Sequence, residues 1–159
     1  MKKFLMVILG LVVLFSMTYA ADYVGSAKCK MCHKGEKKGN VYEKWEASAH
    51  SKAFARLKKG GNDKKAECLP CHVTGFGKGY KVGDANAANF EGVGCETCHG
   101  AGSDYKAMSV MKDKKEAIAK GLLIPNEATC KTCHNAKSPT FKGFNYAEAL
   151  KKIDHKYMK

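Results

Sequence analysis

The chain has 159 residues, among them 28 Lys or Arg, 15 Asp or Glu, 8 Cys and 6 His, and its formal net charge is +13. This length suits one domain. Leu, Ile, Val and Phe make up about 14% of the residues after position 20, and a highly charged chain below roughly 20% cannot bury enough apolar area to offset its chain entropy. An ordinary apolar core is therefore excluded, and the chain is either disordered or folds around something that is not polypeptide.

The first 20 residues have the layout of a secretory signal peptide. A basic start and an apolar run precede Thr18 and Ala20, which supply small residues at the −3 and −1 positions of a cleavage site. A retained membrane anchor is the alternative, because residues 4–21 carry no charge, but no basic stop-transfer flank follows. We expect residues 1–20 to be cleaved and residues 21–159 to form a single periplasmic domain that is not held in a membrane.

All eight cysteines belong to four copies of the pattern C-x-x-C-H. Disulfides would suit an exported chain, and cysteine pairs suit zinc, but neither requires a histidine directly after each pair. C-x-x-C-H is the attachment signature of c-type haem, in which the thiols form thioethers with the porphyrin and the histidine is the proximal iron ligand. We therefore expect four covalently attached haems c, bound through Cys29 and Cys32, Cys68 and Cys71, Cys95 and Cys98, and Cys130 and Cys133, with proximal ligands His33, His72, His99 and His134.

Four haems account for the missing core. Each porphyrin is a large apolar surface, so that packing against haem replaces packing between aliphatic side chains. We expect a mainly α fold with long loops, which forms a compact multihaem cytochrome c with a haem-packed core and unfolds without its cofactor.

The segments between the motifs favour helices and loops. Asn40, with Glu43 three residues later, is typical of a helix start, and Gly60 is typical of its end. We expect one helix over this stretch, with His50, Phe54 and Leu57 on one face. A polar loop follows over 60–67.

The second half of the chain continues this pattern without sustained β alternation. Glycine recurs over residues 75–102, which predicts a loop that wraps closely around its neighbours. A helix is expected over 103–120, ending at Gly121. Another is expected from Asn145, with an apolar stripe formed by Tyr146, Ala149, Leu150, Ile153 and Tyr157.

The sequence contains fewer histidines than four six-coordinate haem irons would need as axial ligands. Four of the six histidines belong to the motifs, which leaves His50 and His155 as candidate distal ligands for two irons at most. A buried structural role for His50 and a surface position for His155 are the alternatives. Met108 and Met111 are weaker distal candidates, because methionines usually serve packing. An iron left open could bind a small gas ligand such as nitric oxide or carbon monoxide.

Several segments resemble the tetrahaem cytochrome c-554 family, the cytochrome c-554/c-prime group. They are residues 23–26 (YVGS), Trp45, 48–53 (SAHSKA), 72–77 (HVTGFG) and 92–102 (GVGCETCHGAG). The resemblance implies a compact helical fold with haems in closely packed pairs, and periplasmic electron transfer, in ammonia oxidisers from hydroxylamine oxidoreductase. It also implies a five-coordinate haem at His72 and distal roles for His50 and His155.

The chain departs from the family's pattern at two places. The family's other distal histidine, about ten residues beyond the third motif, is missing, and residues 106–111 read KAMSVM there. The family's usual proline in the third block is Ala101 here. Because this ligand is missing, the sequence does not assign the sixth ligand of one iron. It also does not assign the biological electron donor.

The excess of basic residues indicates which kinds of partner the protein could bind. Lysines cluster around the first motif, namely Lys28, Lys30, Lys34, Lys37 and Lys38. A solvated surface that offsets haem propionates is one interpretation, and a docking patch for an acidic redox partner protein is the other. Nucleic acid is not an expected partner of an exported haem protein.

We expect an electron carrier and not an enzyme, because the sequence shows no recognisable acid–base or nucleophile constellation. The first alternative is a small-molecule redox enzyme or gas-binding protein that uses an open haem on nitric oxide, nitrite or hydroxylamine. The second alternative is a subunit of a haem filament in which neighbouring chains lend axial histidines.

Overall fold

The structure is a computed structural model that describes residues 20–155. The predicted signal peptide therefore lies outside the described residues except for Ala20, and so do Tyr157 and Met158.

The described residues form short helices joined by long loops, as predicted. The α-helices are α1 (Ser26–His33), α2 (Val41–Ala47), α3 (Ala53–Lys59), α4 (Cys95–His99), α5 (Met108–Met111), α6 (Lys114–Ala119), α7 (Glu127–Lys131) and α8 (Tyr146–Ile153). Three 3-10 helices join them: η1 (Glu36–Lys38), η2 (Leu69–Cys71) and η3 (Ala87–Phe90). Between positions 20 and 155 there is no sheet, only an isolated bridge between Val73 and Glu91.

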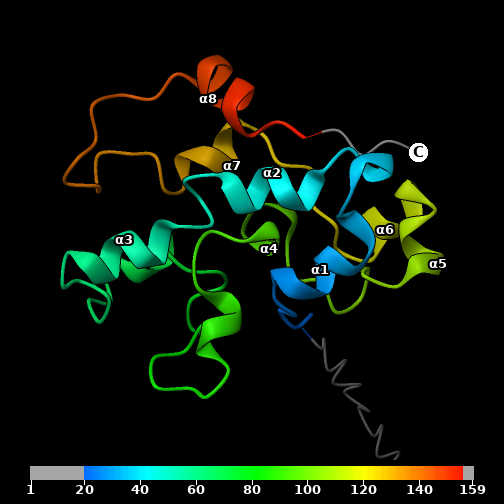
Figure 1. Cartoon of the computed structure of the whole chain (residues 1–159), viewed down its shortest axis with the longest axis horizontal. Helices are drawn as coiled ribbons and strands as arrows, with labels where there is room; N and C mark the ends of the chain where they lie inside the picture. Colours follow the sequence, from blue (N-terminus) through cyan, green and yellow to red (C-terminus); the bar gives the residue numbers. More distant parts are fainter. Residues whose placement is uncertain (1–19, 156–159) are drawn as a thin grey trace, which may run out of the picture.

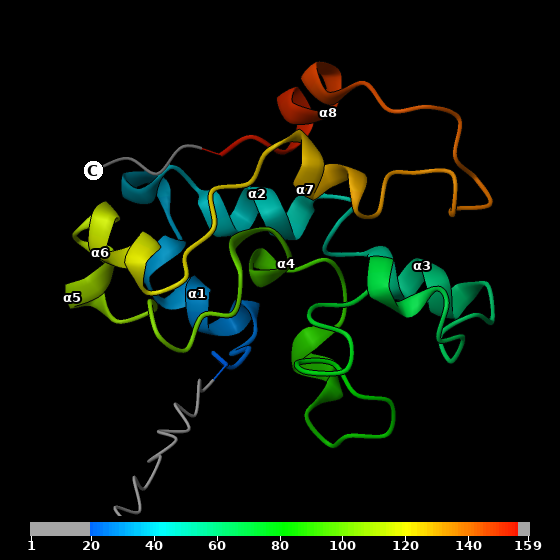
Figure 2. The same ribbon diagram turned by 180° about the vertical axis from the view of Figure 1, so that it is seen from behind.

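The helices surround a central pair. Figures 1 and 2 show α2 and α4 in the middle of the molecule, with α1, α5 and α6 at one end and α3 with the loops around it at the other. The elements α7 and α8 lie along one edge. No helix within residues 20–155 is long and apolar enough to cross a membrane.

The helix expected between Asn40 and Gly60 begins and ends where predicted, but the expectation of one continuous helix is wrong. The chain leaves helical geometry at Ser48, which is extended (φ −73°, ψ 168°) and whose Oγ accepts hydrogen bonds from the backbone N–H groups of His50 (3.2 Å) and Ser51 (3.5 Å). The carbonyl of His50 accepts one from Val93 N–H (2.9 Å). His50 therefore lies in a turn, not on a helix face shared with Phe54.

The helix expected over 103–120 is also two elements. Residues 103–107 are not helical, and α5 ends at Met111. The Asp113 carboxylate then caps α6 by accepting from the N–H groups of Lys115 (2.8 Å) and Glu116 (3.3 Å). An aspartate that satisfies the orphan N–H groups of a helix start favours a new helix there over continuation of the old one.

The start of the last helix is confirmed. Asn145 Oδ1 accepts from Glu148 N–H at 3.1 Å, which is the N-cap that the sequence predicts. The helix ends at Ile153, and Asp154 is extended (ψ 132°). His155 therefore lies beyond the helix, and a helical wheel does not give its direction.

Buried hydrophobic side chains form a small cluster, called the hydrophobic cluster below, at the end of the molecule that holds α3. It consists of Phe54, Leu57, Leu69, Val73 and Tyr80, all at most 8% exposed. The loop expected over 75–102 is present, interrupted by η3 and α4. Residues of the first, third and fourth C-x-x-C-H motifs line cavities elsewhere in the molecule.

Candidate functional site

Each C-x-x-C-H motif lies on a helical turn. The first is in α1, the second in and beside η2, and the third makes up α4. The fourth starts in α7 and continues into a turn in which His134 N–H donates to the Cys130 carbonyl (2.9 Å). Positions i, i+3 and i+4 of a helical turn share one face, so both thiols and the imidazole of each motif are directed to the same side.

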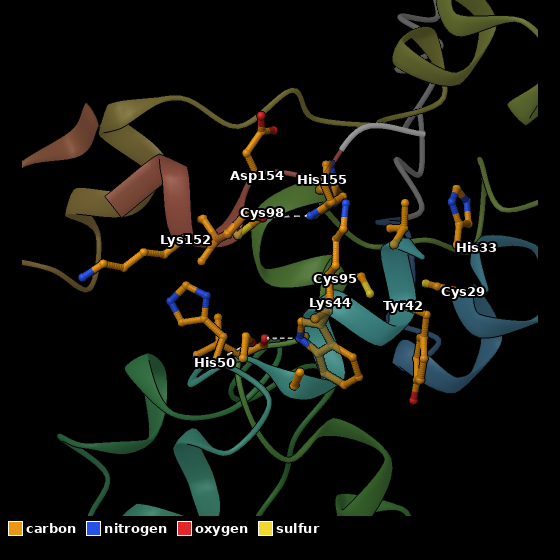
Figure 3. Close-up of a pocket in the computed structure, with 18 of the residues that line it drawn as sticks. Cys29, His33, Tyr42, Lys44, His50, Cys95, Cys98, Lys152, Asp154 and His155 are labelled. Carbon is orange, nitrogen blue, oxygen red and sulfur yellow. Dashed lines mark hydrogen bonds between the residues drawn. The ribbon is translucent and has the colours of Figure 1, made fainter. Parts of the chain in front are cut away.

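Two cavities lie beside these motifs. The larger, about 730 Å³, is bordered by His50 and His155 and by residues of the first and third motifs, namely Cys29, His33, Cys95, Cys98 and His99 (Figure 3). The smaller, about 360 Å³, lies between the third and fourth motifs and α8, with Cys98, His99, Cys130 and Leu150 in its wall. Mostly apolar clefts with a few convergent ligands suit a large planar cofactor.

Both non-motif histidines lie opposite a motif histidine. The ring centroids of His50 and His134 are 6.1 Å apart, and so are those of His99 and His155. A metal about 2 Å from one nitrogen of each imidazole requires centroids about 6 Å apart. The two pairs therefore fit the axial ligands of one iron each. They also specify which motif each non-motif histidine faces.

The second ring nitrogen of several histidines is fixed by a backbone carbonyl. Nδ1 lies 2.9 Å from the Ala53 oxygen in His72, 3.1 Å from the Leu123 oxygen in His99 and 3.0 Å from the Ile153 oxygen in His155. A donor N–H at Nδ1 leaves Nε2 as the nitrogen for a metal, which is the usual support for a histidine ligand.

Burial also favours the form of imidazole that binds metals. It lowers the pKa of His50, His33 and His99 below the usual value for histidine, and neighbouring histidines add to the effect. The neutral ring, which is the metal ligand, is therefore the stable form at these positions near neutral pH. The Phe144 ring stacks on His134, with centroids 4.8 Å apart and planes 18° from parallel.

The thiols of different motifs meet in pairs. Figure 3 shows the sulfur atoms of Cys29 and Cys95 facing each other. Their hydrogen bond raises the pKa of Cys29 and lowers that of Cys95 to about 7. Burial, and then the neighbouring Cys133 thiol, raise the pKa of Cys71 to about 11. The first motif therefore lies against the third, and the second against the fourth.

The third motif also approaches the fourth. Burial raises the pKa of Cys98 to about 11, and the nearby thiols of Cys130 and Cys133 add to this shift. The four motifs consequently form a continuous series in the order first, third, fourth, second, which differs from their order in the chain.

The turn that presents His50 is tied to the loop before the third motif. Trp45 Nε1 donates to the Val93 carbonyl (2.8 Å), and Val93 N–H donates to the His50 carbonyl. Thr74 Oγ1 donates to the Gly92 carbonyl and accepts from Gly94 N–H, both at 2.9 Å. Trp45 and Thr74 belong to segments that carry the family resemblance, but their role was not predictable from the sequence, because it depends on contacts between distant segments.

The two methionine candidates differ in position. Met108 is 63% exposed, whereas Met111 is half-buried and lines the larger cavity together with Cys29 and His33. The structure therefore brings Met111, and not Met108, to the side of the first motif.

The surface of the first motif is open and basic. Met31 is 70% exposed, Cys32 is also exposed, and the lysines that surround them at positions 28, 30, 34 and 37 are exposed. Lys30 Nζ lies 4.8 Å above the Tyr42 ring. Lys28, Lys34 and Lys37 are exposed and present their charge to solvent.

Comparison with known proteins gives a consistent result. The family model "Cytochrome c554 and c-prime" matches residues 28–100. Cytochrome c-554 of Nitrosomonas europaea is 30% identical over 173 residues, covering 89% of this chain and 71% of that protein. The structure of reduced cytochrome c554 from the same organism superposes with a TM-score of 0.65 at 25% identity, covering 85% of this chain and 84% of that one.

Proposed function

Since this chain belongs to the cytochrome c554 and c-prime family, we propose that it is a tetrahaem electron carrier that exchanges electrons with redox partner proteins by outer-sphere transfer. When bound, haem c supplies an iron that alternates between the ferric and ferrous states. The observation that carries the proposal is that the four attachment sites lie side by side: the first against the third, the third and fourth in the wall of one cavity, and the fourth against the second.

The cysteines hold the cofactors and the histidines set their ligation. His33, His72, His99 and His134 are the proximal ligands in this proposal. His50 completes the site of His134, and His155 completes the site of His99, on the support of their 6.1 Å ring separations. Met111 is the distal ligand on the side of His33, supported by its place in the same cavity wall. His72 is left to hold an iron with an open sixth position.

The chain acts as an exported, periplasmic protein in this proposal. Its support is the signal-peptide pattern of residues 1–20 and eight cysteines that all belong to haem-attachment motifs. The remaining residues, 21–159, act as one domain, because the motifs that contact each other come from opposite halves of the chain.

The partner is an acidic redox protein that docks at the first motif. Positive side chains around an accessible cofactor edge steer a negative partner and orient it for transfer. The first motif, which is one end of the series of motifs, has both features: its lysines are exposed, and so is the attachment residue Cys32 that they surround.

The test uses the exported protein fully loaded with haem. The protein is reduced, and the electrons that it passes to an acceptor are counted. Intact mass must show four added haems. The reduced protein should pass four electrons to an oxidised acceptor cytochrome, without sustained turnover of nitrite, hydroxylamine or nitric oxide. Turnover of one of these would replace the carrier by a redox enzyme, and ordered assembly in light scattering would replace it by a filament subunit.

A further inference from the structure

Glu96 is the one charged side chain that is buried among residues 20–155. It lies inside the third motif, between Cys95 and Thr97, and is 2% exposed. In the sequence it belongs to the segment 92–102 that resembles the family. Carboxylates are rarely buried so completely unless they are hydrogen-bonded, and the structure shows what holds this one.

The Glu96 carboxylate is surrounded by backbone donors from two other segments. Val24 N–H donates to both oxygens (2.9 and 3.1 Å), Gly25 N–H donates to Oε2 (2.7 Å) and Gly102 N–H donates to Oε1 (2.7 Å). Short contacts of this kind are charge-assisted, and an ionised carboxylate is acceptor-only. The site is therefore built for a fixed negative charge.

This charge lies at the junction of the first and third motifs. Val24 and Gly25 lead directly into α1, which carries Cys29, and the Cys29 thiol contacts Cys95. Ser26, the first residue of α1, adds a neutral link, because its Oγ accepts from Cys95 N–H (3.2 Å).

The negative charge acts on the groups around this junction. Burial raises the pKa of Tyr105, and the Glu96 carboxylate raises it further. Glu96 also contributes to the raised pKa of Cys29, after the larger effects of Cys95 and burial. The carboxylate belongs to the third motif and its donors directly precede the first, so the charge lies beside the attachment sites of these two motifs.

We propose that Glu96 is a positioning residue that holds the first motif against the third and lowers the reduction potentials of the two irons attached there. The ferric state carries one more positive charge than the ferrous state, so a nearby fixed anion in a medium of low dielectric favours the oxidised form. This inference rests on the proposed function, because it requires haem at both motifs.

The test compares Glu96→Gln with Ser26→Ala in the holo-protein. Glu96→Gln keeps the shape and removes the charge, whereas Ser26→Ala removes a neutral hydrogen bond between the same motifs. Potentials are measured by spectroelectrochemistry and assigned to individual haems by paramagnetic NMR. Glu96→Gln should raise the first and third potentials by about 59 mV or more, a tenfold change in the one-electron equilibrium constant. The second and fourth potentials should stay unchanged, and so should all four in Ser26→Ala.

Two results would overturn the inference: unchanged potentials in Glu96→Gln, or an equal rise in Ser26→Ala. If the Glu96→Gln variant does not acquire its haems, the Glu96→Asp variant provides the test. This variant keeps the charge but moves it away by the length of one methylene. The first and third potentials should therefore rise by an amount that corresponds to less than a tenfold change in the one-electron equilibrium constant. Unchanged potentials would again overturn the inference. An intact mass with fewer than four haems in the wild-type protein would instead refute the proposed function.

Discussion

The imidazole rings of His50 and His134 lie 6.1 Å apart, centroid to centroid, although they come from opposite halves of the chain. His50 is in the turn between α2 and α3, and His134 is in the turn that follows α7. The separation leaves room for one metal ion between the rings. The same holds for His99 and His155.

This geometry predicts the effect of removing each distal histidine. His50→Ala should convert one low-spin iron, the one at the fourth motif, to high spin, because the sixth ligand is lost. His155→Ala should do the same at the third motif. Electron paramagnetic resonance of the oxidised proteins counts the low-spin centres. Added imidazole should restore the low-spin signal, and an unchanged count in both variants would show that neither residue is a ligand.

Gly92 is predicted to support His50 through the backbone. Its φ is +79°, and a Cβ there would meet the Ser51 carbonyl oxygen at 2.5 Å. Gly92→Ala should therefore cost more than about 3 kcal/mol and displace the His50 turn. Gly77 is the matched control, because its φ is +83° but nothing lies within 4 Å of its added Cβ.

Gly77→Ala should cost only roughly 1–2 kcal/mol, the strain of a positive φ alone. Thermal unfolding gives the free-energy differences, and the optical spectrum gives the spin state. Equal stability losses in the two alanine variants would mean that the contact with Ser51 is unimportant.

Met111 and Met108 form a second matched pair. Met111→Leu should abolish the sulfur-to-iron charge-transfer band of the oxidised protein and lower the potential of the haem at the first motif, because thioether ligation raises the potential. Met108→Leu should change neither, since this side chain is 63% exposed. A band that survives in Met111→Leu would exclude Met111 as the ligand.

The lysines of the first motif are predicted to control association with an acidic partner. Replacing Lys28, Lys34 and Lys37 by Glu should slow electron transfer to that partner about tenfold or more at low ionic strength. The difference should shrink as salt screens the charges. Stopped-flow kinetics over a salt series measures this effect. The same triple change at Lys58, Lys64 and Lys65, at the α3 end, is the control, and an equal loss there would exclude a specific docking site.

Haem removal should destabilise the fold according to the place of each motif in the series. Replacing Cys95 and Cys98 by Ala removes the attachment point that meets both the first and the fourth motif. This variant should lose more stability than one that lacks Cys68 and Cys71. The second motif is the other end of the series and meets only the fourth motif, and its Cys68 packs against the hydrophobic cluster. Intact mass confirms the loss of one haem, and thermal unfolding by circular dichroism compares the variants.

The sequence was sufficient for the features that depend on local chemistry. Thioether formation and proximal ligation require a fixed spacing of cysteines and histidine, so the sequence alone predicts Cys95, Cys98 and His99 as one haem site, and the structure places them on one helical turn. Asn145 also predicted a helix start correctly, because its side chain bonds an N–H only three residues away.

The sequence was insufficient where distant segments decide the local structure. The break at Ser48 was missed because the turn it opens is also held by Val93, which lies in another loop. The partners of His50 and His155 could not be assigned for the same reason. Nothing in the sequence marks Glu96 as buried, since its backbone donors come from segments before the first motif and after the third.

The spatial order of the motifs has a consequence for biogenesis. During synthesis the first motif emerges long before the third, and the second long before the fourth, so neither partner of a contacting pair can meet its neighbour early. Under the proposed export, a motif that crosses the membrane early would receive its haem before its neighbour in the folded protein has arrived. The fourth motif, which lies against both the second and the third, is the last to arrive, and only its arrival completes the interior.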